Sequence, residues 1–241
     1  MRSLSIIIPA YNEETRLPAT LDRILEYLRE REWAFIEVLV VDDGSKDGTA
    51  EIVRGYGSRA SAVQLISNPG NRGKGYAVRN GMLRAKGVWR LFTDSDLSAP
   101  IEEVDKLFAA AEKEKALVSF GSRALDRSLV SVHQPMAREL SGRIFNLVMR
   151  LVMRLPFRDT QCGFKLYHAG AAEKIFSRQR LDGFGFDVEN LFLARKLGLK
   201  AVETPVKWAN VEGTRVSLAS GMKAFWDLAV IRWNQLLGRY R

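Results

Sequence analysis

Short apolar runs that end in acidic or polar loops set the strongest limit on how this chain can fold. Residues 36–41 and 89–92 each lead into a pair of aspartates, and residues 4–9 lead into the polar loop 10–14. Helical patterns separate these runs, and strict alternation of strand and helix is typical of a parallel sheet with right-handed crossovers. The carboxyl ends of such strands share one edge, where open α/β sheets bind ligands. We therefore expect an α/β fold with a binding edge rich in carboxylates.

Asp94 and Asp96 stand one residue apart at the end of the run 89–92. Side chains alternate along a strand, so the two carboxylates would point the same way. Such a pair can hold Mg²⁺ or Mn²⁺, which completes its shell with phosphate oxygens and water. Alternatively, the aspartates cap a turn or the helix expected after Pro100. The acidic and polar loops after the other strands favour ligand binding.

A glycine-rich basic loop, residues 68–75, precedes the helix expected at residues 76–86. Its Gly-Lys pair is not followed by serine or threonine, so the loop does not match a P-loop. Its backbone amides and Lys74 could still bind a phosphate. A solvated loop without a ligand is the alternative, and the residues alone leave both open.

The positive charge of the chain predicts an anionic partner. The formal net charge is +9 and the pI is near 9.8, which suits nucleic acid, phosphorylated ligands or an anionic membrane surface. Arginines flank apolar helical patterns at residues 133–158 and 219–237, which is typical of helices that lie in a membrane interface. Ordinary packing on the sheet is the alternative. Nucleic-acid binding would favour basic and aromatic residues interleaved on one exposed surface, and this pattern is different.

We expect neither a signal peptide nor a transmembrane helix. A strand pattern begins by Leu4, and every long apolar stretch is interrupted by arginine or aspartate. Cys162 is the only cysteine, which excludes an intramolecular disulfide and suits a reducing compartment. These features predict a cytoplasmic protein, peripheral at the cytoplasmic face of a membrane.

Several motifs resemble those of family 2 glycosyltransferases with the GT-A fold. They are Ile-Ile-Ile-Pro-Ala-Tyr-Asn-Glu-Glu at 6–14, Val-Val-Asp-Asp-Gly-Ser-Lys-Asp-Gly-Thr at 40–49, Asn-Arg-Gly-Lys-Gly at 71–75 and Asp-Ser-Asp at 94–96. Four more resemble the dolichyl-phosphate β-glucosyltransferases, with the dolichyl-phosphate mannose synthases as near relatives. These are Gly-Ser-Arg at 121–123, Arg-Asp-Thr-Gln-Cys-Gly-Phe-Lys-Leu at 158–166, Phe-Asp-Val-Glu at 186–189 and Glu-Gly-Thr-Arg at 212–215.

The resemblance implies a Rossmann-like, mostly parallel central sheet flanked by helices, together with amphipathic interface helices. It implies a single GT-A domain over residues 1–241. Residues 1–123 would form the nucleotide-sugar half, residues 124–218 the acceptor half, and residues 219–241 a C-terminal amphipathic helix.

The resemblance also implies roles for individual residues. The residues expected to bind the donor are Pro9, Tyr11, Glu13, Asp42, Asp43, Lys74, Asp94, Ser95, Asp96 and Arg215. The residues expected to bind the acceptor phosphate are Arg123, Arg138, Ser141 and Arg143. The residues expected to coordinate the metal are Asp94 and Asp96. Ser98 would be a weak ligand at the position where the mannose synthases have glutamine. The catalytic set is Asp94, Asp96, Arg123 and Arg138.

Two further carboxylates have candidate functions, and one residue departs from the motifs of the mannose synthases. Asp187 is a candidate general base or, alternatively, a helix N-cap, and Asp159 is expected to support its loop. Asn210 stands where the mannose synthases have an arginine, which puts their pyrophosphate contacts in doubt here.

The implied activity is inverting transfer of a sugar to a polyprenyl or dolichyl phosphate, with glucose from UDP-glucose as the expected donor and a β-linked product. One alternative is transfer from GDP-mannose, and another is a family 2 glycosyltransferase with a hydroxyl acceptor, which would need a general base. A nucleotide-sugar-binding membrane scaffold is the alternative without catalysis.

Overall fold

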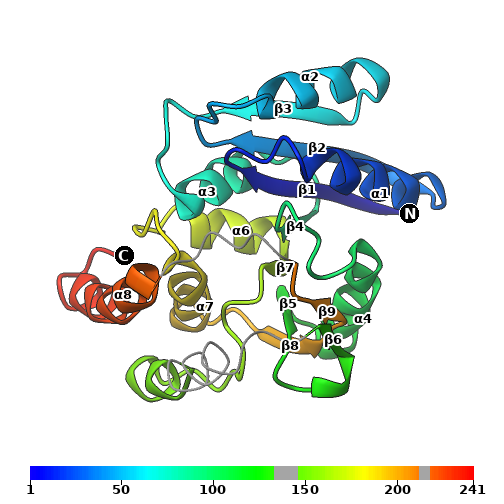
Figure 1. Cartoon of the computed structure of the whole chain (residues 1–241). Coiled ribbons are helices and arrows are strands. Elements are labelled where there is room, and N and C mark those ends of the chain that lie inside the picture. Colours follow the sequence, from blue (N-terminus) through cyan, green and yellow to red (C-terminus); the bar gives the residue numbers. More distant parts are fainter. Residues whose placement is uncertain (133–145, 212–217) are drawn as a thin grey trace.

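The computed structural model of this chain describes residues 1–132, 146–211 and 218–241, with side chains in the last segment from residue 225 onward. Within these residues, seven strands form one sheet in the order β3-β2-β1-β4-β7-β5-β8 (Figure 1). The strands are β1 (Arg2–Ala10), β2 (Trp33–Asp42), β3 (Val63–Ser67), β4 (Trp89–Thr93), β5 (Val118–Ser122), β7 (Phe164–His168) and β8 (Ala201–Pro205). A short pair, β6 (Val130–Val132) with β9 (Trp208–Ala209), lies beside the sheet.

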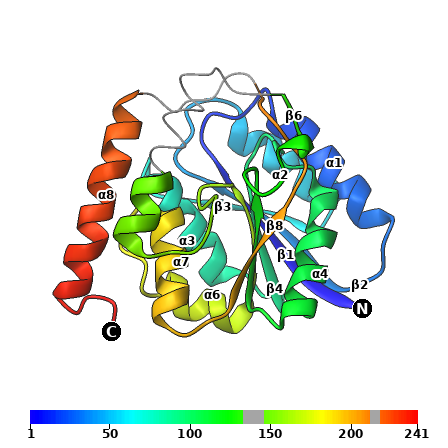
Figure 2. The ribbon, with the colours of Figure 1, turned by 90° about the horizontal axis from the view of Figure 1, so that it is seen from below.

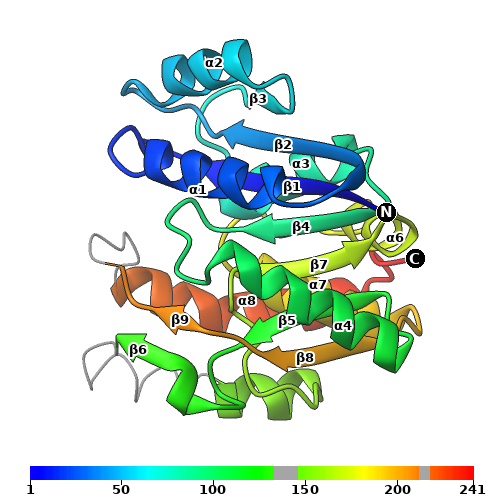
Figure 3. The same ribbon diagram turned by 90° about the vertical axis from the view of Figure 1, so that its right-hand side faces the viewer.

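The direction of β7 changes which residues reach the binding edge. β7 runs antiparallel to both β4 and β5, and the other pairs of the sheet are parallel (Figure 3). Its amino end therefore lies beside the carboxyl ends of its neighbours, with Phe164 opposite Thr93. The segment that precedes β7, residues 159–163, consequently joins the edge formed by the loops after β1, β2 and β4. The expectation of a mostly parallel sheet is confirmed.

Helices cover both faces of the sheet (Figure 2). The helices are α1 (Leu17–Arg29), α2 (Thr49–Arg59), α3 (Lys74–Arg84), α4 (Val104–Glu114) after the short 3₁₀ turn η1 (Ile101–Glu103), α6 (Ala169–Phe176), α7 (Phe186–Lys196) and α8 (Leu218–Leu236). Alternation along β1 divides the core, because Ile7 packs with α3 and α7 while Ile6 and Ile8 pack with α1 and α4.

The predicted helix at residues 133–158 is only partly in the described chain, and its end was predicted wrongly. Residues 133–145 lie outside the described residues, and residues 146–153 are helical. The helix ends there because Arg154 adopts a left-handed conformation, with φ of 55°, two residues before Pro156. Proline disfavours helical geometry in the residue before it, so the chain turns away. Further along the chain, β8 ends at Pro205 and β9 begins at Trp208.

α8 is the longest helix among the described residues, yet none of the described helices has the length and apolar character needed to cross a membrane. Its inner face carries Leu228 and Ile231, both buried against the α7 side of the core. The C-terminal end of the chain returns to this core, where the buried Tyr240 hydroxyl donates to Glu189 Oε1 at 2.5 Å.

Gly81 and Gly55 give a matched test of the packing of α3 on the sheet. A Cβ on Gly81 would lie 2.6 Å from Ile7 Cγ2 and 2.9 Å from Val41 Cγ2, whereas a Cβ on Gly55 in α2 meets nothing within 4 Å. We expect Gly81→Ala to destabilise the fold by about 1–3 kcal/mol through overpacking. Gly55→Ala should stabilise it by about 0.5–1 kcal/mol through helix propensity. Urea unfolding measures both, and shifts of the same sign would contradict this packing.

Candidate active site

Lys74 and Asp94 meet at the carboxyl edge of the sheet. Lys74 is the first residue of α3, and its Nζ lies 2.6 Å from Asp94 Oδ1, just beyond the end of β4. Burial lowers the pKa of Lys74, but the carboxylates of Asp94, Asp187 and Asp96 outweigh it and raise the pKa overall. Lys74 is therefore held as a cation at the point where the sequence predicts a diphosphate.

Gly163 leaves room for the carboxylate of Asp94. The amide of Asp94 donates to the Gly163 carbonyl at 3.2 Å, which continues the antiparallel pairing of β4 with β7. A Cβ on Gly163 would lie 2.1 Å from Asp94 Oδ2. Any side chain at position 163 would therefore displace the carboxylate that binds Lys74.

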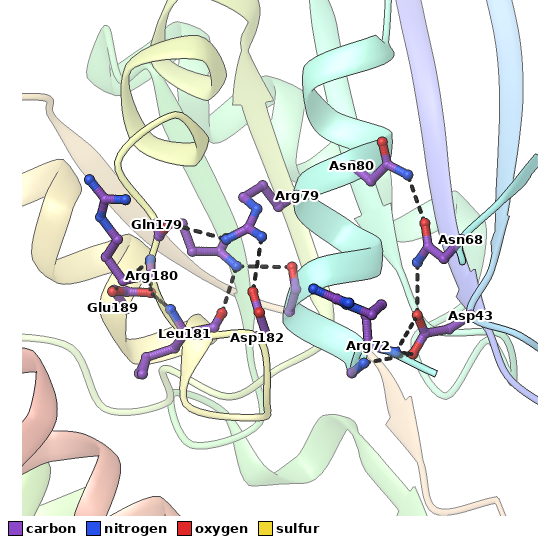
Figure 4. A network of polar contacts seen from close by, with 12 residues as sticks. Asp43, Asn68, Arg72, Arg79, Asn80, Gln179, Arg180, Leu181, Asp182 and Glu189 are labelled. Atoms are coloured by element: carbon purple, nitrogen blue, oxygen red, sulfur yellow. Dashed lines mark hydrogen bonds and ion pairs between the residues drawn. The ribbon is translucent and has the colours of Figure 1, made fainter. Parts of the chain in front are cut away.

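Asp43 organises the glycine-rich loop in front of α3 (Figure 4). Its carboxylate accepts hydrogen bonds from the amides of Arg72, at 3.1 Å, and Gly73, at 2.7 Å. It also accepts from Asn68 Nδ2 at 2.8 Å, and Asn68 in turn accepts from Asn80 Nδ2 at 2.7 Å. This geometry gives Asp43 a positioning function for the loop, and its predicted contact with the donor stays a prediction.

The other side of the α3 amino terminus is held by the segment after α6 (Figure 4). Gln179 Nε2 donates to the carbonyls of Gly75, at 2.9 Å, and Leu181, at 2.8 Å. Arg79 forms an ion pair with Asp182 at 3.0 Å. The first turn of α3, and with it Lys74, is thus fixed from both sides by groups that do not themselves reach Asp94.

Arg123 and Asp159 form a second ion pair at the same edge. The Asp159 carboxylate accepts from the Arg123 amide at 3.0 Å, from Nε at 2.7 Å and from Nη2 at 2.9 Å. Burial would raise the pKa of Asp159, but the guanidinium of Arg123 outweighs it and holds that pKa below its usual range. Asp159 thus fixes the orientation of Arg123, a contact that the sequence did not predict. Its Oδ1 also accepts from the Gln161 amide at 3.3 Å, which agrees with the support expected for its loop.

Lys165 and Asp187 form a third, fully enclosed ion pair. Lys165 has no exposed surface, and its Nζ donates to Asp187 Oδ1 and, at 2.6 Å, to the Cys162 carbonyl. Burial raises the pKa of Asp187 against the lowering effect of Lys165 and Lys74. The N-cap of α7 is Gly185, so the alternative that Asp187 caps this helix is wrong.

Four further predicted residues of the donor site lie at the carboxyl ends of β1 and β2 or in the loop after β1. Glu13 binds Arg16 through two contacts of 2.7 and 2.8 Å, and Asp42 Oδ1 accepts from the Ser45 amide at 3.0 Å. Pro9 ends the apolar part of β1 next to Ala10, and Tyr11 follows the strand; both are half-buried. Their contacts with a donor stay predictions. Four predicted residues, Arg138, Ser141, Arg143 and Arg215, lie outside the described residues.

Asp94 and Asp96 suit a hard divalent cation by their chemistry. Asp96 Oδ1 accepts from the Ser98 amide at 3.0 Å, and the adjacent Ser95 carbonyl accepts from Thr20 Oγ1 at 2.6 Å, which fixes the loop between them. No cluster of three or more histidine, cysteine, aspartate or glutamate residues that could hold a metal occurs in the described ranges. Two carboxylates nevertheless fit Mg²⁺ or Mn²⁺, which bind few protein oxygens and take the rest from phosphates and water.

Sequence reasoning assigned no function to Lys165, Gly163 or Gln179. A signal existed for Lys165, because a lysine between Phe164 and Leu166 interrupts an apolar strand and a buried lysine needs a partner. Gly163 lies against Asp94, which is 69 positions away in the sequence, and Gln179 contacts Gly75, which is 104 positions away. No local sequence pattern reveals such contacts.

Comparison with known proteins identifies the family. The sequence profile described as Glycosyl transferase family 2 matches residues 5–176. The chain belongs to this family. It is 36% identical over 250 residues to dolichyl-phosphate β-glucosyltransferase of Drosophila melanogaster, covering 99% of this chain and 77% of the relative. It is 34% identical over 255 residues to the enzyme of the same name from Saccharomyces cerevisiae, covering 99% and 76%.

Solved structures confirm the GT-A fold of this glycosyltransferase. Mannosyl-3-phosphoglycerate synthase from Rubrobacter xylanophilus superposes with a TM-score of 0.71 at 18% identity, over 99% of this chain and 75% of that one. Glucosyl-3-phosphoglycerate synthase from Mycobacterium tuberculosis, in complex with Mn²⁺, UDP-glucose and phosphoglyceric acid, gives 0.69 at 20% identity, over 95% and 79%.

Substitution of Gly163 tests the position of the Asp94 carboxylate. We expect Gly163→Ala to lower glycosyl transfer by about 100-fold or more, because it displaces a preorganised charge at the site. Gly170→Ala is the control, since a Cβ there meets only His168 Nδ1 at an ordinary 3.7 Å. Equal activity of both variants and the unmodified enzyme would contradict the assigned geometry.

The ion pair between Arg123 and Asp159 should contribute to the free energy of unfolding near neutral pH, and this contribution should be lost in acid. We expect Asp159→Asn to destabilise the fold by about 1–3 kcal/mol near neutral pH, because it leaves the partly buried guanidinium of Arg123 without its partner. The folded pKa of Asp159 is depressed. The difference should therefore be complete above the unfolded value of about 3.9 and disappear as the pH falls through the folded pKa. Urea unfolding across this range measures it, and a pH-independent difference would contradict the pairing.

Proposed function

We propose that this enzyme transfers glucose from UDP-glucose to a polyprenyl phosphate such as dolichyl phosphate, with inversion to a β-linked product. The observation that carries the proposal is the 33–36% identity, over nearly the whole chain, to dolichyl-phosphate β-glucosyltransferases from widely separated eukaryotes. Those names supply the sugar, the acceptor and the β configuration. In-line attack on an α-linked donor gives that configuration directly.

Departure of the nucleotide places negative charge on a diphosphate, and the edge of the sheet offers cations to stabilise it. Lys74 is held there by Asp94, and Arg123 is fixed in orientation by Asp159. Asp94 and Asp96 would hold Mg²⁺ or Mn²⁺, which supplies Lewis-acid charge at the leaving group. Arg215 is the further cation that the family resemblance assigns to the pyrophosphate.

The acceptor chemistry explains why a general base is dispensable. A phosphate monoester has a second pKa near 6, so it is mostly dianionic near neutral pH and needs little proton removal. Asp187, the candidate base, is buried and bound to Lys165. This enclosure supports a positioning function for Asp187 and favours a phosphate acceptor over a hydroxyl acceptor. Arg138, Ser141 and Arg143 remain the proposed contacts of the acceptor phosphate, together with Arg123.

The proposal includes the organisation and the location inferred from the sequence. Residues 1–123 bind the nucleotide sugar, residues 124–218 the acceptor, and residues 219–241 form an amphipathic helix. The enzyme works at the cytoplasmic face of a membrane, where its acceptor is anchored by the polyprenyl chain.

Asp96→Ala tests the proposed donor site. Formation of a lipid-linked sugar from UDP-glucose, Mn²⁺ and a short polyprenyl phosphate should fall by at least about 100-fold, because charge stabilisation at the leaving group is lost. The thermal midpoint should stay within a few degrees of the parent value. Asp22→Ala, which removes a carboxylate from the exposed side of α1, is the control and should keep full activity. Substantial metal-dependent turnover by Asp96→Ala would overturn the metal assignment.

A second pair of variants separates the phosphate acceptor from the hydroxyl acceptor. Asp187→Asn preserves the shape of the side chain but leaves the buried Lys165 without its carboxylate, so we expect it to destabilise the fold by about 3 kcal/mol. At a temperature where the variant is still folded, we expect less than a tenfold loss of transfer. Arg138→Ala should raise the KM for the polyprenyl phosphate. Complete loss in Asp187→Asn together with unchanged kinetics in Arg138→Ala would instead favour a hydroxyl acceptor and a general base.

A further inference from the structure

Three arginines from three different segments converge at the end of α7 that is remote from the active site. Arg154 follows the helix of residues 146–153, Arg195 lies in the last turn of α7, and Arg232 lies on α8. They line a pocket of about 260 Å³ together with Lys196 and Phe192. Arg195 is eight residues beyond Asp187, so the pocket lies about 12 Å along the helix axis from the active-site end of α7.

These arginines have no acidic partner among the residues that the structure describes. Arg232 Nε donates to the Val152 carbonyl at 2.8 Å, and Arg195 donates to the Arg154 carbonyl. Both contacts are to backbone oxygens at the end of the helix of residues 146–153, so they orient the guanidinium groups without neutralising them. Burial lowers the pKa of Arg232, and the charges of Arg154 and Arg195 lower it further. In the part of the chain that the structure describes, no carboxylate therefore neutralises these three positive charges.

Exposed apolar side chains lie on α8, which carries Arg232, and on the helix that precedes Arg154. On α8, Trp226 and Trp233 are seven residues apart and therefore lie on one face of the helix. Leu236 follows, with 78% of its surface exposed. On the helix of residues 146–153, Leu147 and Leu151 stand four residues apart, and Leu151 is 71% exposed. The opposite faces of both helices pack into the core, through residues such as Ile231 and Met149. Both helices lie on the α7 side of the sheet (Figure 2).

We propose that this surface, termed the docking surface, binds a bilayer that contains anionic phospholipids, with a headgroup phosphate held by Arg154, Arg195 and Arg232. Its members are these arginines with Leu147, Leu151, Trp226, Trp233 and Leu236. Planar guanidinium groups bind phosphate through paired hydrogen bonds. Exposed leucines and tryptophans on helices enter the boundary between headgroups and acyl chains. The combination fits an anionic membrane better than a soluble anion, which would not cover the apolar side chains.

The docking surface is distinct from the catalytic residues. That the docking surface brings the enzyme to a membrane-borne acceptor rests on the proposed function. That it binds lipid does not rest on the proposed function. Vesicle binding without donor or acceptor therefore tests the docking surface alone. Glycosyl transfer to a short, water-soluble polyprenyl phosphate tests the activity alone.

The test compares partition of the full chain onto phosphatidylcholine vesicles with and without phosphatidylglycerol. The double variant Arg154→Gln/Arg195→Gln should bind the anionic vesicles about 30-fold more weakly, at the free energy expected for two basic residues near an anionic surface. Its transfer to the water-soluble acceptor should be unchanged. The control Arg59→Gln/Arg84→Gln removes the same charge from exposed arginines at the ends of α2 and α3, and it should bind like the parent.

Leu151→Ser/Leu236→Ser completes the set, and it should weaken binding to both kinds of vesicle. Equal binding by the Arg154/Arg195 variant and its control would overturn the proposal, because net charge alone would then explain the affinity. Parent binding that is indifferent to phosphatidylglycerol would also overturn it. Binding of inorganic phosphate to the parent without any vesicle binding would overturn the assignment to a lipid headgroup.

Discussion

The ion pair between Lys74 and Asp94 is the interaction on which the rest of the site depends. It joins the amino end of α3 to the carboxyl end of β4, and the contacts around it keep both partners in place. Asp43 and Gln179 hold the first turn of α3 from two sides, and Gly163 leaves space for the carboxylate. A loose lysine could find many partners in solution. A lysine fixed by its backbone offers its charge at one point, which is what stabilising a departing diphosphate requires.

Three ion pairs lie together at this edge, and their charges are balanced within the protein. Removing water from such groups is costly, and breaking one pair leaves an uncompensated buried charge. Stability alone therefore does not explain the arrangement. Each pair uses its carboxylate to fix a cation: Asp94 fixes Lys74, Asp159 fixes Arg123, and Asp187 fixes Lys165 beneath them. Under the proposed function, these oriented cations stabilise the departing diphosphate. The arginines of the docking surface differ, because they have no acidic partner among the described residues.

Periodicity in the sequence was sufficient for the sheet and for the position of Asp94 and Asp96 beyond the end of β4. The two aspartates do not follow the alternation expected of a strand, however, because β4 ends at Thr93 and Ser95 and Asp96 form a turn. Periodicity also failed where a contact depends on tertiary direction. Asp187 looked like a helix cap because nothing local shows that antiparallel β7 brings Lys165 beneath α7. Asp159 was expected to support a loop, but only the fold reveals that it orients Arg123. The helix predicted to reach residue 158 ends at 153, since the backbone turn at Arg154 overrides the apolar pattern.

The central claim is that this edge uses a nucleotide-linked glucose and a phosphate acceptor. The most direct measurement is a competition in which the parent enzyme receives UDP-glucose and GDP-mannose with different isotope labels, Mn²⁺ and a short polyprenyl phosphate. Mass spectrometry identifies the label, and NMR gives the anomeric configuration of the product. We expect a lipid phosphate that carries the label of the glucose donor in the β configuration. A mannose-labelled product, or an α-linked one, would contradict the claim.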